Sequence, residues 1–183
     1  MMHLITGGSG SGKSAYAEEQ VINSGPGKRV YIATMIPWGE EGRQRVERHR
    51  RLRQEKQFET IECYTALAKA KIPPESTVLL ECMSNLVANE MFEPEGAHEA
   101  TVDAVMEGIL HLRQQADKLL IVTNEIFSDG LEYDPDTMRY LSYLGAVNQR
   151  LAQEADCVTE VVYGIPLELK RPGRKQNGIT PAF

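Results

Sequence analysis

The sequence predicts a single α/β domain in which helices cover both faces of a mainly parallel sheet. Three observations predict this class. Short apolar runs alternate with helical patterns along the chain, the 183 residues suffice for one core but not for two full domains, and no internal repeat or low-complexity block breaks the pattern. We expect the domain to span residues 1–169, and residues 170–183, where Pro, Gly and basic residues follow no period, to form a flexible tail.

The elements follow from two kinds of spacing. Short apolar runs predict strands at 2–6, 29–33, 58–62, 77–81, 118–123 and 158–163. Between them, apolar residues at three- and four-residue spacing predict helices at 13–23, 41–56, 64–70, 83–92, 97–116 and 137–156. The Gly and Pro clusters at 25–27 and 73–74 are typical of connections between elements, not of domain boundaries.

The composition excludes several classes of protein. The chain has the 42% hydrophobic and 25% charged residues of an ordinary globular protein, and its net charge of -6 argues against a general nucleic-acid binder. Cys63, Cys82 and Cys157 are far apart and lack zinc-site spacing, so we expect reduced, buried thiols. No apolar run suits a signal peptide or a spanning helix, so we expect a cytoplasmic protein without a membrane span.

Residues 7–14 read GGSGSGKS and match the P-loop pattern, between a predicted strand and a predicted helix. Glycines let successive backbone N–H groups point at phosphate oxygens, and the helix that starts at Lys13 directs its positive dipole end at the same anion. We expect Lys13 to reach the β and γ phosphates and the Ser14 hydroxyl to bind Mg²⁺. The predicted nucleotide-binding residues are Gly7, Gly8, Ser9, Gly10, Ser11, Gly12, Lys13 and Ser14.

A P-loop site also needs an acidic residue near the metal ion. Glu81 ends the run TVLLE and Glu125 follows LIVTN, so both are expected at the carboxyl edge of the sheet. Either carboxylate could instead interact with a helix N-terminus. Because TVLLE has the form of an apolar strand followed by an acid, we prefer Glu81 as the metal ligand beside Ser14.

The segment RQRVERHRRLR, residues 43–53, surrounds His49 with arginines, and two interpretations are open. It can be a solvated basic helix face with an exposed histidine. Alternatively, Arg45 and Arg53, one turn on either side of His49, hold phosphate oxygens bidentately, and their charge keeps the imidazole neutral and nucleophilic. The second interpretation predicts that His49 attacks a bound triphosphate.

These motifs, taken in order, resemble one known family. They are GGSGSGKS, YIAT at 31–34, RVERHR at 45–50, TIEC at 60–63, LLEC at 79–82, VTNE at 122–125 and VNQRLA at 147–152. The family is the bifunctional adenosylcobinamide kinase/adenosylcobinamide-phosphate guanylyltransferase of cobalamin biosynthesis, and the resemblance covers about residues 2–170. It implies a P-loop fold of the RecA-like kind. It also implies phosphorylation of adenosylcobinamide by ATP or GTP, then transfer of GMP from GTP through a histidine to the new phosphate.

By this resemblance, His49 carries GMP and acts in catalysis together with Lys13. The other residues implied to flank or contact the nucleotide are Ala33, Thr34, Met35, Arg50, Arg51, Leu52, Arg53, Glu62 and Glu81. Carboxylates can accept hydrogen bonds from the N1–H and N2 amine of guanine, which fits a preference for GTP. The resemblance further implies a corrinoid substrate and a homotrimer.

The chain departs from the family pattern in two places. After His49, it lacks the usual Arg-Pro and has Phe58 in place of a tryptophan, and residues 126–135 replace a glycine-rich run. The second departure bears on the corrinoid side more than on the nucleotide chemistry. Two other functions remain open, namely a P-loop kinase of another small alcohol, which would not need His49, and a nucleotide-binding regulatory protein without transfer activity.

Overall fold

The structure is a computed structural model that describes residues 1–37, 39–128, 130–131 and 133–173, without the side chains of residues 41, 45, 48, 49 and 52. Its strands are β1 (Met2–Thr6), β2 (Lys28–Ala33), β3 (Phe58–Glu62), β4 (Ser76–Glu81), β5 (Lys118–Val122), β6 (Cys157–Val162) and β7 (Ile165–Lys170). Its helices are α1 (Lys13–Ile22), α2 (Gly39–Glu55), α3 (Met83–Phe92), α4 (Thr101–Gln115) and α5 (Pro135–Glu154), with the single 3₁₀ turns η1 (Leu67–Lys69) and η2 (His98–Ala100).

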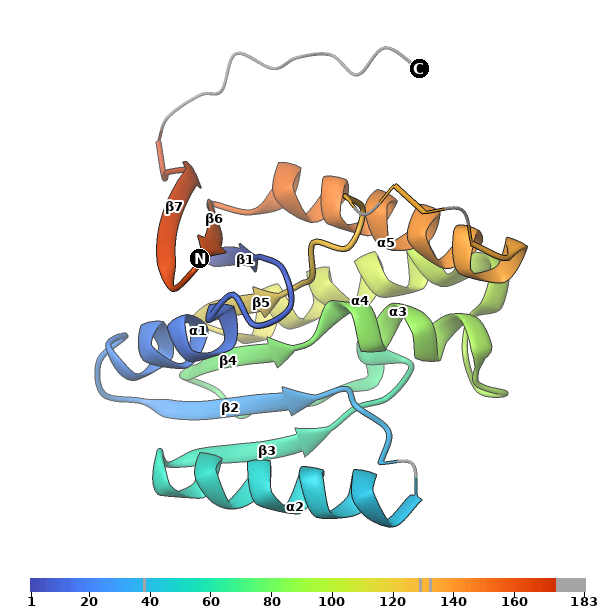
Figure 1. Ribbon diagram of the computed structural model, residues 1–183. Helices are drawn as coiled ribbons and strands as arrows, with labels where there is room; N and C mark the ends of the chain where they lie inside the picture. Colours follow the sequence, from blue (N-terminus) through green and yellow to red (C-terminus); the bar gives the residue numbers. More distant parts are fainter. Residues whose placement is uncertain (38, 129, 132, 174–183) are drawn as a thin grey trace.

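The strands form one sheet in the order β3-β2-β4-β5-β1-β6-β7 (Figure 1). All neighbouring pairs are parallel except β6 and β7. β1, which leads into the P-loop, therefore lies between β5 and β6, and β5 separates it from β4. Because parallel strands end at the same edge, the segments that follow β1 to β6 emerge together there. The predicted P-loop α/β fold is confirmed.

Apolar packing holds the sheet on both faces. Successive strand residues point to opposite faces, so Leu80 packs in the cluster formed with α3, α4 and α5, whereas Leu79 packs in the cluster formed with α1. Both side chains are fully buried. α2 lies along β3 at the edge of the sheet (Figure 1). Burial on both faces explains why the strands are near-continuous apolar runs in the sequence.

All six predicted strands form, but two of the predicted helices are partly wrong. The segment 64–70 contains only η1, and 97–116 is divided into η2 and α4. The reason is the buried carboxylate of Glu90, which accepts hydrogen bonds from the N–H groups of Ala66 at 2.6 Å and Ala97 at 2.9 Å. These bonds hold Ala66 and the start of the second segment in turns. Ala66 and His98 both have a left-handed φ of 52, and a left-handed residue cannot continue a helix, so the α-helix of the second segment begins only at Thr101.

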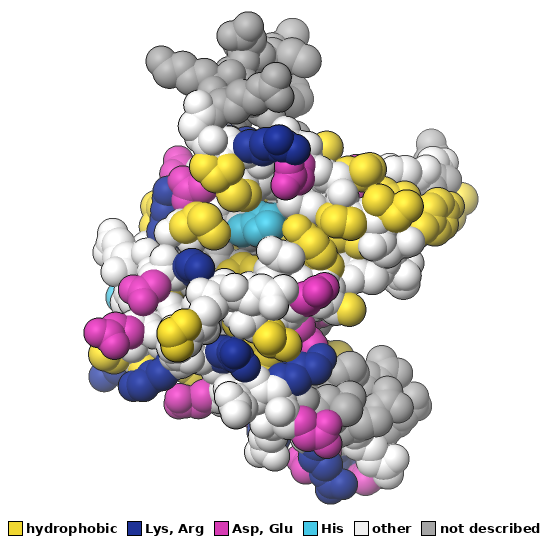
Figure 2. Space-filling model, turned by 90° about the vertical axis from the view of Figure 1, so that its left-hand side faces the viewer, with side chains coloured by type: hydrophobic (Ala, Val, Ile, Leu, Met, Phe, Trp, Pro, Cys, Tyr) yellow, Lys and Arg dark blue, Asp and Glu magenta, His cyan; other side chains and the backbone are white. Residues whose placement is uncertain are grey.

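β7 is a seventh strand, beyond the six that the sequence predicts. It pairs antiparallel with β6 across a two-residue turn. Pro166 disfavours a strand in the sequence, but an edge strand tolerates proline because one of its sides makes no ladder bonds. Its apolar residues Ile165, Leu167 and Leu169 alternate along the strand and are exposed. Figure 2 shows the side of the molecule that is on the left in Figure 1. Hydrophobic side chains gather in its upper half, at the height where β6 and β7 lie in Figure 1.

The structure also bears on the cysteines, on the expected C-terminal tail and on the expected absence of a membrane span. The three cysteines are unpaired, as expected, but each is half-buried and not fully buried. Burial raises the pKa of the Cys63 and Cys157 thiols. Of the expected tail, Lys170 ends β7, and residues 174–183 lie outside the described residues. In the described part of the chain, no helix combines the length and apolar character needed to cross a membrane.

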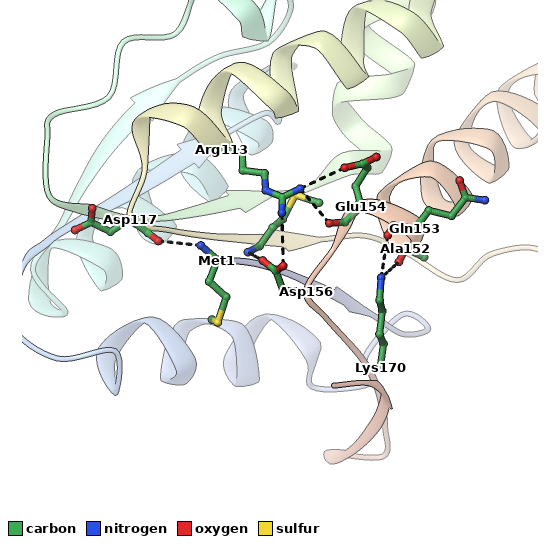
Figure 3. Close-up of polar contacts among 9 residues, drawn as sticks. Met1, Arg113, Asp117, Ala152, Gln153, Glu154, Asp156 and Lys170 are labelled. Carbon is green, nitrogen blue, oxygen red and sulfur yellow. Dashed lines mark hydrogen bonds and ion pairs between the residues drawn. The ribbon is translucent and has the colours of Figure 1, made fainter. Parts of the chain in front are cut away.

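The C-terminal end of α5 is capped by cations from other elements (Figure 3). α5 has no basic residue in its own last turn. The Lys170 ammonium donates to the carbonyls of Ala152 at 3.1 Å and Gln153 at 2.8 Å, and Arg113 of α4 donates to the carbonyl of Glu154 at 3.1 Å. These donors pair with helix-end carbonyls and offset the negative end of the dipole. The caps therefore join β7 and α4 to α5.

We expect Lys170→Met to lower the free energy of unfolding by about 1–2 kcal/mol, because it keeps the aliphatic stem but removes the charged donor from two carbonyls. Urea unfolding followed by circular dichroism measures the change. Arg171→Met is the matched control. Arg171 forms an exposed ion pair with Glu168, so its loss should change stability by less than about 0.5 kcal/mol. Equal losses in the two variants would contradict the capping role.

Candidate functional site

The P-loop, residues 7–14, joins the end of β1 to the start of α1. Gly12 has φ 92, in the left-handed region that favours glycine, and a Cβ on Gly7 would lie 2.5 Å from the carbonyl oxygen of Val161. The Lys13 side chain is buried, and its ammonium donates to the carbonyl of Gly8 at 3.0 Å. The positive charge therefore lies against the loop. The remaining residues of the turn are Ser9, Gly10, Ser11 and Ser14.

The loop is held by the segments that follow both neighbouring strands. After β5, the Glu125 N–H donates to the carbonyl of Gly7 at 3.1 Å. After β6, the Gly164 N–H donates to the carbonyl of Ser11 at 2.8 Å. A Cβ on Gly12 would lie 3.3 Å from the Cα of Gly164, so this approach also depends on glycine. The phosphate-binding backbone is thus fixed before any ligand arrives.

The Glu81 carboxylate, at the carboxyl end of β4, is bonded through both of its oxygens. Oε1 accepts a hydrogen bond from the Ser14 hydroxyl, and Oε2 accepts one from the Tyr31 hydroxyl at 2.9 Å. Ser14 and Glu81, predicted as metal ligands from distant parts of the sequence, are therefore in contact. Tyr31 of β2 was not predicted, although it begins the YIAT run that the sequence analysis singles out.

Tyr31 also contacts α2 through its ring. The guanidinium carbon of Arg53 lies 3.9 Å from the ring centre, in a cation–π contact, and Arg53 is 5% exposed. Burial and then the nearby Glu81 raise the pKa of Tyr31 well above its usual value, whereas Arg53 acts in the opposite direction. The Tyr31 hydroxyl therefore stays protonated and donates to Glu81 at physiological pH.

The end of β2 is tied to the start of α3. The Thr34 hydroxyl donates to the Cys82 carbonyl and accepts from the Cys82 N–H, both at 2.8 Å, and the Asn89 amide donates to the Thr34 carbonyl at 2.8 Å. Thr34 is fully buried in this connection. On either side of it, Ala33 and Met35 line a cavity. Of the predicted run 33–35, the middle residue therefore connects β2 to α3, and the two outer residues line the cavity.

Glu62, at the end of β3, is held by two donors from different segments. One oxygen of its carboxylate forms an ion pair with Arg50 of α2, and the other accepts a hydrogen bond from the Tyr64 hydroxyl at 3.0 Å. Burial, and then the bond to Glu62, raise the pKa of Tyr64. Both predicted residues of this group, Arg50 and Glu62, are thus in contact with each other.

The structure describes the side chains of only some of the other predicted residues of α2. Arg51 is exposed and pairs with Glu47 of the same helix at 3.2 Å, as in the solvated interpretation. The side chains of His49 and Leu52 lie outside the described residues, although their backbone belongs to α2. Val46 and Arg53 line the cavity. They are three residues before and four residues after position 49, so position 49 belongs to the same helix face.

One cavity of about 260 Å³ collects these groups. The predicted residues that line it are Ser14, Ala33, Met35, Arg53, Glu62 and Glu81. The lining also contains residues that the sequence analysis misses, namely Glu18, Tyr31, Val46, Tyr64, Cys82 and Asn85. Tyr31, Val46 and Cys82 lie within quoted motifs and could have been found there. The others carry no motif signal, because only the packing of α1, α2 and α3 around the strand ends brings them to the cavity.

The carboxylate of Glu125, the alternative metal ligand, bonds to its own turn and not to Ser14. Its carboxylate accepts hydrogen bonds from the Phe127 N–H at 3.1 Å and the Ser128 hydroxyl at 2.7 Å. These bonds shape the turn after β5. Of the two candidates, Glu81 is therefore the one whose carboxylate contacts Ser14.

The Ser14 hydroxyl and the Glu81 carboxylate fit Mg²⁺, a hard cation that prefers oxygen ligands and keeps several waters and phosphate oxygens in its shell. Among the described residues, no group of three or more His, Cys, Asp or Glu side chains lies together.

Comparison with known proteins finds one family that matches nearly the whole chain. A model of the family described as cobinamide kinase/cobinamide phosphate guanyltransferase matches residues 3–169. The bifunctional adenosylcobalamin biosynthesis protein CobU of Escherichia coli (strain K12) is 34% identical over 93% of this chain and 100% of its own length. The protein of the same name from Salmonella typhimurium is 33% identical over 93% and 100%. The related protein CobP of Pseudomonas aeruginosa is 28% identical over 93% and 98%.

Likeness to solved structures is weaker. The flagellar accessory protein FlaH of Methanocaldococcus jannaschii superposes with a TM-score of 0.49 at 11% identity, over 93% of this chain and 78% of that one. A likeness of this size carries no argument, and the fold rests on the strand order itself. The family match, by contrast, spans nearly the whole chain and is supported by relatives matched over their full length. The chain belongs to the cobinamide kinase/cobinamide phosphate guanyltransferase family.

Proposed function

We propose that this chain phosphorylates adenosylcobinamide and then transfers GMP from GTP to the product, giving adenosylcobinamide-GDP. One observation carries the proposal, namely that a single cavity is lined by the P-loop site and by the arginine-rich helix. Ser14 and Glu81 represent the first, and Val46 and Arg53 of α2 represent the second. A phosphate cradle beside a cationic helix offers a bound triphosphate two reactions, at its γ-phosphate and at its α-phosphate.

In the first reaction, the γ-phosphoryl group of ATP or GTP moves to the aminopropanol hydroxyl of the corrinoid. The bond between the γ-phosphorus and the oxygen bridging to the β-phosphate breaks, a bond to the hydroxyl oxygen forms, and the hydroxyl proton is released. Backbone N–H groups of residues 7–14 bind the phosphate oxygens, and the Lys13 ammonium, now 3.0 Å from the Gly8 carbonyl, turns to the β and γ phosphates. The protein acts chiefly by positioning and by offsetting charge.

Ser14 and Glu81 are the residues that would hold Mg²⁺ in this reaction. Held there, the ion would offset negative charge on the phosphate oxygens. Tyr31 supports the ligand, because its hydrogen bond to the second oxygen fixes the orientation of the Glu81 carboxylate. Contacts of this kind tune a metal site without touching the metal.

In the second reaction, a ring nitrogen of His49 forms a bond to the α-phosphorus of GTP, and pyrophosphate leaves. A phosphate oxygen of adenosylcobinamide phosphate then attacks the same phosphorus, and the bond to His49 breaks. Support comes from the place of position 49 on α2, on the helix face that carries Val46 and Arg53 at the cavity. Arg53 supplies positive charge where the phosphates lie.

Glu62 is the residue best placed to recognise guanine. It lines the same cavity, and its carboxylate is oriented by Arg50 and by the Tyr64 hydroxyl at 3.0 Å. A carboxylate has enough acceptor capacity to take hydrogen bonds from guanine N1–H and the N2 amine in addition. Glu81 is bonded to Ser14 and Tyr31 and is assigned to the metal ion instead.

The protein also acts as a homotrimer in this proposal. Support comes from β7, an edge strand whose Ile165, Leu167 and Leu169 side chains are exposed in a row. Exposed apolar rows on edge strands are surfaces on which chains associate.

The guanylyl-transfer half is tested with GTP labelled at the α-phosphate in the presence of Mg²⁺. The wild type should take up covalent label that is acid-labile and base-stable, as expected for a phosphoramidate, and His49→Ala should take up none. His111→Ala, on α4, is the matched control and should label like the wild type. Equal labelling of His49→Ala and wild type would refute the assignment of His49.

The metal assignment is tested by comparing two glutamates. Glu81→Gln should lower kcat for cobinamide phosphorylation about 100-fold and raise the Mg²⁺ concentration needed for half-maximal rate, because an anionic ligand is lost. Glu125→Gln should change both quantities by less than about threefold, because that carboxylate bonds to its own turn. The reverse order of effects would move the metal ligand to Glu125.

The trimer is tested by light scattering coupled to size-exclusion chromatography. The expected mass is three times the chain mass of 20.5 kDa. A mass equal to one chain across a range of protein concentrations would refute the trimer and leave the β7 surface unpaired.

A further inference from the structure

Tyr163 has a backbone conformation that lowers the stability of the fold, and its ring is exposed to solvent. It is 93% exposed and forms, with Gly164, the two-residue turn between β6 and β7. Both turn residues have positive φ, 52 at Tyr163 and 78 at Gly164. Turns with positive φ at both centres favour Asn, Asp or Gly, and a bulky side chain there is uncommon. An exposed aromatic in a strained turn suggests a role outside folding.

This turn lies directly against the P-loop. The Gly164 N–H donates to the carbonyl of Ser11 at 2.8 Å, and the Cα of Gly164 lies 3.3 Å from the position of a Cβ on Gly12. Tyr163 immediately precedes Gly164 in the chain. The Cα that carries its side chain therefore lies one residue from the backbone that contacts the P-loop. The turn cannot move relative to the loop without breaking this hydrogen bond.

The sheet order decides which end of a nucleotide reaches this turn. In a P-loop, Lys and Ser serve the β and γ phosphates and the metal ion, so the γ end of the triphosphate lies at Ser14 and Glu81. Glu81 ends β4, on one side of β1, and Tyr163 follows β6, on the other side. A triphosphate that extends along the loop with its γ end at Glu81 therefore carries its nucleoside toward the turn after β6.

We propose that the Tyr163 ring is the stacking platform for the base of the nucleotide that donates the γ-phosphate. This assignment rests on the proposed kinase function and names a contact for its donor. Stacking of a base on an aromatic ring tolerates any base, because every base has a π face. The platform therefore accepts adenine and guanine alike, so either ATP or GTP serves as the phosphoryl donor.

The platform also separates the two reactions of the proposed function. For guanylyl transfer, the α-phosphate must face α2, which lies beside β3 at the opposite end of the sheet from β7. The guanine of that GTP then occupies the cavity lined by Glu62, away from Tyr163. One phosphate cradle thus serves two base positions, a tolerant one at Tyr163 and a selective one at Glu62.

The test uses Tyr163→Asn, because asparagine suits the left-handed turn and the variant should fold with a Tm equal to or above that of the wild type. Calorimetry with the β,γ-imido analogue of ATP and Mg²⁺ should show about tenfold weaker binding, whereas inorganic triphosphate, which has no base, should bind as to the wild type. Tyr163→Phe, which keeps the ring, should restore the affinity. Phe92→Asn, which removes an exposed ring at the end of α3, is the control and should bind like the wild type.

In the kinase assay, Tyr163→Asn should raise KM for ATP and for GTP about tenfold with kcat little changed. The GTP concentration that half-saturates covalent labelling should stay constant. Unchanged affinity of Tyr163→Asn for the ATP analogue, or equal weakening for inorganic triphosphate, would overturn the platform. Because the binding measurements need no turnover, they stay decisive even if the wild type fails to phosphorylate cobinamide, a result that would refute the proposed function alone.

Discussion

The carboxylate of Glu81 is the point on which the site depends. Its two oxygens bond to the hydroxyls of Ser14 and Tyr31, and Arg53 stacks on the ring of that tyrosine. The P-loop helix, two strands of the sheet and the arginine-rich helix are thereby joined through one partly buried network. Polar groups in such a network are costly when unpaired, so each member restricts the others to one arrangement. The network ties α2, which lies along β3 at the edge of the sheet, to the end of β4.

The P-loop itself is fixed from two sides. Hydrogen bonds from Glu125 and Gly164 to its carbonyls attach it to the segments after β5 and β6, and Gly7 and Gly12 permit the close approach of β6 and its turn. A cradle that is rigid before ligand binding avoids part of the ordering cost of binding. The same rigidity gives the loop two distinct flanks. One carries Glu81 and the cavity beside α2, and the other carries Tyr163, so the ends of a bound nucleotide meet different chemistry.

How much could be predicted from the sequence differs by element. The buried strands were predicted within one residue, because burial on both faces makes each a continuous apolar run. β7 was missed, because an exposed edge strand containing Pro166 lacks that signal. The helix expected at 64–70 reduces to η1, because the Glu90 carboxylate of α3 binds the Ala66 N–H, a contact between segments that no local pattern contains.

The sequence by itself determined the fold class. It also predicted the P-loop with Ser14 and two candidate acidic strand ends, because each of these motifs is a local pattern in the chain. Only the tertiary structure decided that Glu81, and not Glu125, meets Ser14, and that Tyr31, Tyr64 and Asn85 reach the cavity. It also placed Tyr163 against the P-loop. The physical reason is that parallel strands distant in sequence end at one edge of the sheet. Which side chains meet there depends on strand order and helix packing, and periodicity along the chain records neither.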